Sequence, residues 1–143
     1  MARFVTTIAS PWSAEQAFEF MADLRNFEKW DDTVSSSTLV EGDEPGHGAT
    51  FRVKVMAAEL DYVITEYEAP TRAVAEATTR LLHSNDVIEV ASTDDGCEVT
   101  YDAMLELRGV FGVANPMVGL FFDRIGNRAS KGLATALDGT RVR

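Results

Sequence analysis

The sequence predicts an α+β fold, in which a seven-stranded antiparallel sheet wraps around one long C-terminal helix. Three observations lead to this prediction. From residue 34 onward, apolar residues alternate with a period of two through several successive stretches. The linkers between these stretches are short and rich in turn-forming residues, which favours antiparallel hairpins over parallel crossovers. A single long stretch with helical periodicity then follows near the end.

The N-terminal part predicts one strand followed by two short helices. Residues 3–9 are rich in β-branched side chains, which is typical of a strand. Ser13 can cap the first helix, because its hydroxyl accepts hydrogen bonds from free backbone N–H groups and Gln16 follows three residues later. The segment around Phe27 and Trp30 is expected to continue as a second, short helical turn.

Six more strands are expected between the short helices and the long one. Turn-forming residues separate them. Pro70 lies between two of the strands, where it removes no hydrogen bond from the sheet, and residues 94–96, Asp-Asp-Gly, form another turn. The expected strands cover residues 34–41, 50–56, 60–68, 72–79, 81–92 and 97–108.

The last element is a helix expected over residues 116–137. Pro116 suits the first helical position, where an N–H has no intrahelical partner, and Gly139 marks the end. One face of this helix is apolar and should pack on the sheet; it contains Val118, Phe121, Phe122, Ile125, Ala129, Leu133 and Ala136.

A cavity between this helix and the sheet is expected, because a strongly bent sheet cannot be filled everywhere by one helix. Small residues such as Gly126, Ala129 and Gly132 lie on or beside the inner face of the helix and leave volume unfilled. An apolar cavity with a few polar groups is the usual form of a small-molecule site. The alternative is a solid core, filled by residues such as Phe121 and Leu133.

One carboxylate is expected to point into this space. Asp86 and Ser84 have the same strand phase as Ile88, so both are expected to face inward. A buried carboxylate must find a partner or stay protonated. Arg124 and Arg128 flank the apolar helix face and could pair with it, hold an anionic ligand group, or extend into solvent.

Aromatic residues are the other candidates for ligand contacts. Tyr62 and Tyr101 could orient a ligand carbonyl or hydroxyl with their phenol groups, and Phe27 and Trp30 could pack in the core or line the mouth of the cavity. The complete set of expected ligand-binding residues is Phe27, Trp30, Phe51, Val53, Tyr62, Ile64, Asp86, Ile88, Tyr101, Ala103, Leu105, Phe121, Ile125, Arg128 and Ala129.

The composition argues against several partners. Lys and Arg number 13 and Asp and Glu number 23, so the formal net charge is −10. This charge repels nucleic acid and anionic lipid, so neither nucleic-acid binding nor membrane insertion is expected. Cys97 is the only cysteine, which is typical of a reducing compartment, and we expect a cytoplasmic protein with one domain over residues 1–143. The sequence leaves open whether it forms a homodimer.

No motif identifies a catalytic centre. The sequence contains no Gly-x-Ser-x-Gly elbow, no phosphate-binding loop and no dinucleotide fingerprint. His47 and His83 are far apart and lack metal-ligand spacing. We therefore expect no metal and no cofactor, and catalytic residues, if there are any, stay unknown.

Several short motifs carry a family resemblance. They are Ser10-Pro11 with Ala17-Phe18, and the segments 23–30, 46–51, 64–70 and 95–101. In this order they resemble the START-like, or Bet v 1-like (SRPBCC), superfamily, and most of all its polyketide cyclase/dehydrase branch. The resemblance implies a helix-grip fold with a deep pocket for lipid-, polyketide- or sterol-like molecules. It carries over no catalytic residues, because this branch has no shared catalytic signature.

Three functions fit these observations. We favour binding of a small hydrophobic molecule without turnover, because no acid–base pair is recognisable. The first alternative is a cyclase- or dehydratase-type enzyme, in which Tyr62, Tyr101, Asp86 and an arginine polarise a carbonyl and move a proton. The second is a protein-interaction module.

Overall fold

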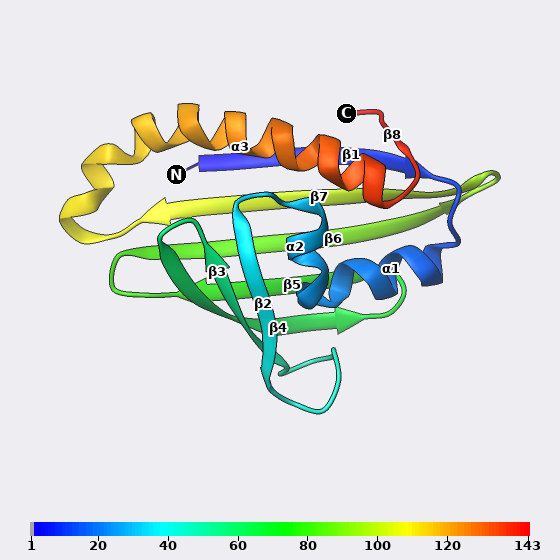
Figure 1. The fold of residues 1–143 in the computed structure, drawn as a ribbon, viewed down its shortest axis with the longest axis horizontal. Coiled ribbons are helices and arrows are strands. Elements are labelled where there is room, and N and C mark those ends of the chain that lie inside the picture. The colour runs from blue at the N-terminus through cyan, green and yellow to red at the C-terminus, as the bar shows by residue number, and fades with distance from the viewer. Residues whose placement is uncertain (1) are drawn as a thin grey trace.

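A computed structural model gives the structure of residues 2–143, except for the side chains of residues 110, 111 and 113. One antiparallel sheet bends around the long helix α3, as expected for an α+β helix-grip fold (Figure 1). The elements in chain order are β1 (Ala2–Ser10), α1 (Ala14–Ala22), η1 (Leu24–Asn26), α2 (Phe27–Trp30), β2 (Val34–Glu41), β3 (Thr50–Val55), β4 (Ala58–Glu68), β5 (Arg72–Thr78), β6 (Leu82–Thr93), β7 (Gly96–Leu107), η2 (Gly109–Ala114), α3 (Asn115–Ala136) and β8 (Thr140–Arg141).

The sheet has eight strands in the order β2-β3-β4-β5-β6-β7-β1-β8. The seven expected strands are all present, and their ends differ from the expected ones by at most two residues. The additional strand, β8, pairs with β1 through Ile8 and Ala9. Its two residues are too few to show a periodicity, so the sequence pattern could not indicate it.

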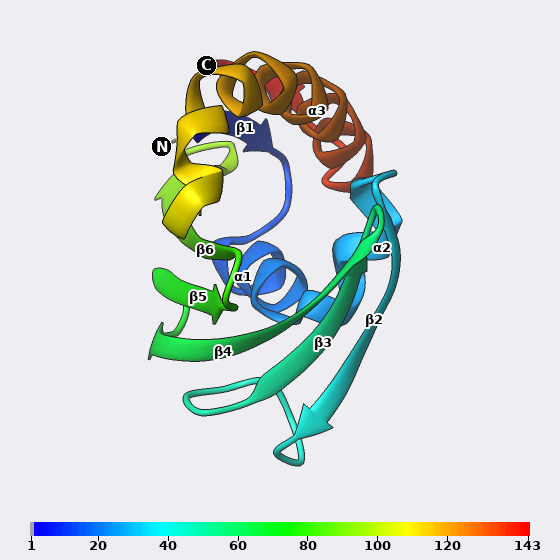
Figure 2. The ribbon, with the colours of Figure 1, turned by 90° about the vertical axis from the view of Figure 1, so that its left-hand side faces the viewer.

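The short helices close the concave side of the sheet near one end. Ser13 caps α1 as expected, because its Oγ accepts a hydrogen bond of 3.1 Å from the backbone N–H of Gln16. Figure 2 shows α1 and α2 inside the curve that the sheet forms from β1 through β4 to β2. Phe27 and Trp30 are both buried, with their rings in an edge-to-face contact.

Helix α3 lies across the sheet but is buried along only part of its length. In its C-terminal half, Ala129, Ser130 and Leu133 are buried against the rest of the protein. In its N-terminal half, Met117 and Leu120 are each 76% exposed. The helix therefore packs closely at one end and loosely at the other. No described helix combines the length and the hydrophobicity needed to cross a membrane.

Two glycines of α3 have a different role from the one expected. A Cβ at Gly132 would overlap the carbonyl oxygen of Trp30, and a Cβ at Gly126 would overlap the ring of Phe4. These glycines allow close approach of the helix to α2 and β1, so other parts of the chain fill the space that their side chains would occupy, although Gly126 also borders the open space between helix and sheet. Their absence of side chains does not by itself create the cavity.

Candidate functional site

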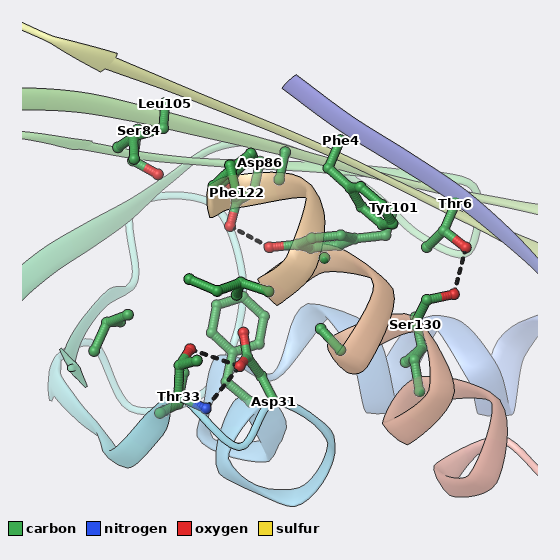
Figure 3. Close-up of a pocket in the computed structure, with 18 of the residues that line it drawn as sticks. Phe4, Thr6, Asp31, Thr33, Ser84, Asp86, Tyr101, Leu105, Phe122 and Ser130 are labelled. Atoms are coloured by element: carbon green, nitrogen blue, oxygen red, sulfur yellow. Dashed lines mark hydrogen bonds between the residues drawn. The ribbon is translucent and has the colours of Figure 1, made fainter. Parts of the chain in front are cut away.

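An internal cavity of about 190 Å³ lies between the concave face of the sheet and α3. Its wall comes from β1, α2, the segment after α2, the start of β2, β3 and the turn after it, β4, β6, β7 and the inner face of α3. Figure 3 shows side chains from these separate elements converging on this space. Most of the lining is aromatic or aliphatic, with a small number of carboxyl and hydroxyl groups. The expected hollow is therefore present.

Most of the residues that the sequence predicted for the site lie on the cavity wall. From α2 and the sheet these are Phe27, Trp30, Tyr62, Asp86, Tyr101, Ala103 and Leu105. From α3 they are Phe121, Ile125 and Ala129. They were found because residues of one strand phase, or of one helix face, point to the same side. Their role in binding a ligand stays a prediction.

Four predicted residues belong to the solid core instead. Phe51, Val53, Ile64 and Ile88 are almost completely buried and do not line the cavity. They share a core cluster with α1, which covers part of the concave face. Strand alternation indicated the correct face, but it could not indicate how far along each strand α1 would extend.

Arg128 also lies elsewhere than predicted. Its side chain is 61% exposed, and its guanidinium forms an ion pair of 3.0 Å with Asp32. Arg128 lies on the solvent side of α3, does not line the cavity and forms no pair with the Asp86 carboxyl. Of the three roles that the sequence allowed for this arginine, extension into solvent is the correct one.

A carboxyl–phenol pair forms the polar centre of the cavity. Tyr101 Oη donates a hydrogen bond of 2.5 Å to Oδ2 of Asp86. The two residues lie on adjacent strands, where Asp86 is opposite Ala103 and Tyr101 is opposite Ile88. The ring of Tyr101 is held by an edge-to-face contact with Trp30, with ring centroids 5.1 Å apart. The strand register and the aromatic contact together fix the geometry of the pair.

Burial raises the pKa of Asp86 to about 7. The hydrogen bond from Tyr101 opposes this shift, because it favours the charged form, whereas the carboxyls of Asp31 and Asp102 add to it by repulsion. Burial also raises the pKa of Tyr101 and of Tyr62. Both phenols are therefore neutral near pH 7, while Asp86 can gain or lose a proton there.

The other hydroxyls of the cavity bond mainly to one another. Tyr62 Oη and Ser84 Oγ lie 2.7 Å apart, as do Thr6 Oγ1 and Ser130 Oγ. Because Thr6 donates its own proton to the carbonyl oxygen of Arg143, Ser130 must be the donor in its bond to Thr6. This bond ties β1 to α3 at one end of the cavity (Figure 3).

Asp31 is a site residue that the sequence did not reveal. It follows α2, and its Oδ1 accepts hydrogen bonds from the backbone N–H and the hydroxyl of Thr33, at 2.9 and 2.7 Å. Burial raises the pKa of this carboxyl, and the bonds from Thr33 oppose the shift. In Figure 3 it points from the α2 side toward the Asp86–Tyr101 pair. The spacing of an aspartate two residues before a threonine was the only signal, and it is typical of many turns.

Further lining residues were also missed. Phe4 and Thr6 on β1, Val55 on β3, and Phe122 on α3 contribute to the wall. Phe122 was placed on the apolar helix face but was not selected for the site. The sequence of β1 gave no reason to select Phe4 for the site, so only the three-dimensional arrangement identifies it as a lining residue.

The bent sheet, the long helix and the cavity between them define a helix-grip protein. The model of the family described as polyketide cyclase / dehydrase and lipid transport matches residues 1–138. The chain belongs to this family, so the predicted membership of the polyketide cyclase/dehydrase branch is confirmed. Among curated proteins, none matches the chain.

Solved structures share the fold at low sequence identity. A START superfamily protein from Mycobacterium smegmatis is 12% identical, with a TM-score of 0.75 over 96% of this chain and 98% of that one. A conserved protein from Geobacillus kaustophilus is 14% identical, with a TM-score of 0.69 over 97% and 98% of the two chains. Ara h 8.0201 is 14% identical, with a TM-score of 0.61 over 93% and 97%. At these identities the similarity establishes the fold.

Proposed function

We propose that the protein binds a compact, largely apolar molecule in the cavity between the sheet and α3. The observation that carries this proposal is the cavity itself, with an apolar wall and a few convergent polar groups. Family membership supports it, since the family description includes lipid transport. A volume of about 190 Å³ favours a ring-sized molecule over a complete lipid or a long polyketide, because sites for drug-sized ligands measure roughly 300–1,000 Å³.

A cavity-filling variant tests this proposal. Ala103 lines the cavity and is buried, so Ala103→Leu should fill part of the space and remain folded. Ala91 lies exposed on β6, and Ala91→Leu is the matched control. The probe is 2-phenylethanol, whose dissociation constant is measured by ¹H–¹⁵N NMR titration. Binding by the wild type and by Ala91→Leu, and weakening of about tenfold or more in Ala103→Leu, is the expected result. If no ring compound binds, or if both variants behave alike, the cavity is not the site.

A second function is favoured by one specific observation. Asp86 has a pKa of about 7 and bonds directly to Tyr101, so it could accept or donate a proton at neutral pH. Such a group is suited to the cyclase or dehydratase chemistry of the alternative hypothesis. Once a ligand is known, mass spectrometry of that ligand before and after incubation separates the two functions. Turnover that Asp86→Asn abolishes without loss of affinity would identify an enzyme.

A further inference from the structure

We infer that the ligand carries a protonated amine on a ring-sized apolar body, and that the carboxyls of Asp86 and Asp31 bind this amine. The inference rests on the proposed function of the cavity and names the chemical class of its ligand.

The negative charge of the carboxyls in the cavity is not compensated by a cation of the described cavity wall. Asp86 is 4% exposed, and its Oδ1 accepts no hydrogen bond from any described residue. Asp31 likewise uses only Oδ1, on Thr33. The described residues of the cavity wall include no Lys, Arg or His, and Arg128, the cation that acts on Asp31, pairs with Asp32 in solvent. A carboxylate removed from water requires a counter-charge, and an ammonium ligand would supply it.

The cavity wall offers few free hydrogen-bond donors to ligands of other types. Tyr101 donates its proton to Asp86, and Ser130 donates to Thr6, which donates to the chain itself. Tyr62 and Ser84 share one hydrogen bond, so only one of their two hydroxyl protons is left for a ligand. Trp30 Nε1 has no partner among the described residues, but it is completely buried and does not open into the cavity. A ligand rich in carbonyl oxygens would therefore find few partners, and a carboxylate or phosphate ligand would be repelled by the two acidic groups.

The aromatic wall and the volume of the cavity both suit a small cation with one ring. Phe27, Trp30, Tyr62 and Tyr101 form a chain of edge-to-face contacts around the carboxyl groups. Aromatic rings attract cations through the negative charge density of their faces. The volume of about 190 Å³ slightly exceeds an engineered apolar cavity of about 150 Å³ that binds benzene. One ring with a short amine chain is the size of ligand that fits.

The pH dependence separates an amine from a neutral ligand. The titratable groups of the cavity that face Asp86 are Tyr101 from β7, Tyr62 from β4 and Asp31 from the segment after α2. Asp102, also on β7, acts on Asp86 from the opposite face of the sheet, where it pairs with Arg3. The described lining residues of α3 add none. Since both tyrosines stay neutral, ionisation of Asp86, whose pKa burial raises to about 7, dominates between pH 5 and pH 8. An amine should bind more tightly as Asp86 ionises, whereas a neutral ligand that accepts a hydrogen bond from protonated Asp86 should bind less tightly.

Three probes of nearly equal size test the inference: 2-phenylethylamine, 2-phenylethanol and 3-phenylpropanoate. Their dissociation constants are measured by NMR titration of the wild-type protein at pH 5 and at pH 8. At pH 8 the amine should bind about tenfold more tightly than the alcohol, and the acid should bind least. This preference should fall several-fold at pH 5. Because no variant is needed, the result does not depend on the folding of a mutant.

Variants then assign the effect to the carboxyl. Asp86→Asn should weaken binding of the amine about tenfold and change binding of the alcohol less than threefold. Asp61→Asn, which removes an exposed carboxyl on β4 that pairs with Arg52 on β3, should change neither. Equal or tighter binding of the alcohol or the acid at pH 8 would overturn the inference. If the alcohol binds at least as tightly as the amine at pH 8 and Ala103→Leu blocks it, the proposed function stands while the amine is excluded; if no probe binds, both fail.

Discussion

The concave face of the sheet is solid beside α1 and hollow beneath α3, whose lining residues run from Val118 to Leu133. In the solid region, large side chains such as Phe18 and Phe51 are almost completely buried in one continuous core. In the hollow region, two carboxyls, several hydroxyls and aromatic edges surround an open volume. The regions for stability and for recognition are therefore separated along one sheet. Packing is complete where no ligand is needed, and polar groups are buried where one is expected to bind.

Truncation of a large side chain tests this separation with the largest expected effect. Phe51→Ala should lower the free energy of unfolding by about 3–5 kcal/mol, because it opens a void in a filled core. Phe121→Ala, in the N-terminal half of α3, removes a ring that is 52% exposed and should change this free energy by less than about 0.5 kcal/mol. Urea unfolding measures both. Similar losses for the two variants would show that the hollow region contributes to stability as the solid one does.

Two glycines of α3 sharpen the comparison along the helix. Gly132→Ala should destabilise the protein by about 1–3 kcal/mol, because the new Cβ meets the Trp30 backbone and α3 must shift. Gly119→Ala, in the loosely packed half, meets nothing within 4 Å. It should stabilise the protein by about 0.5–1 kcal/mol through helix propensity. Thermal and urea unfolding of both variants provide the measurement, and a loss of stability in Gly119→Ala would contradict the loose packing.

Burial of Asp86 should make stability depend on pH. Its pKa is raised to about 7 in the folded protein from 3.8, so the folded state retains a proton that the unfolded state releases. Its contribution to stability is therefore present at low pH and is lost as pH rises through about 7. Between pH 5 and pH 8 the wild type should lose about 2 kcal/mol relative to Asp86→Asn.

The measurement for this prediction is urea unfolding of both proteins at the two pH values. Asp61→Asn, on the exposed face of β4, controls for a general change of net charge. A constant difference between the wild type and Asp86→Asn across this range would mean that the carboxyl is ionised throughout, and the proton transfer invoked for the enzyme alternative would lose its basis.

Much of the fold could be predicted from the sequence, because periodicity determines which side chains share a face. Asp86 and Tyr101 were both expected to point inward, and the short turn between β6 and β7 fixes the register that brings them together. The strand β8 was missed, since two residues carry no periodicity. Local patterns thus account for the elements and for the orientation of their side chains.

The division of the concave face into core and cavity could not be predicted in the same way. Ile64 and Tyr62 are neighbours of identical phase on β4, yet one belongs to the core alone and the other also lines the cavity. The difference depends on where α1 ends relative to the strands, which is a tertiary property. Asp31 is a similar case, because its burial depends on how α2 packs against α3.

The smallest effect is expected for Arg128, which the sequence placed in the site and the structure places in solvent. Its pair with Asp32 is exposed on both sides, and such pairs contribute little to stability. Arg128→Ala should therefore leave the urea midpoint unchanged within error, and Asp32→Asn should behave in the same way. Binding of 2-phenylethanol should also change less than twofold, because the guanidinium does not contribute to the cavity wall. A large loss of binding in Arg128→Ala alone would show that the arginine turns inward when a ligand is present. Arg128 would then be part of the cavity wall in the bound protein.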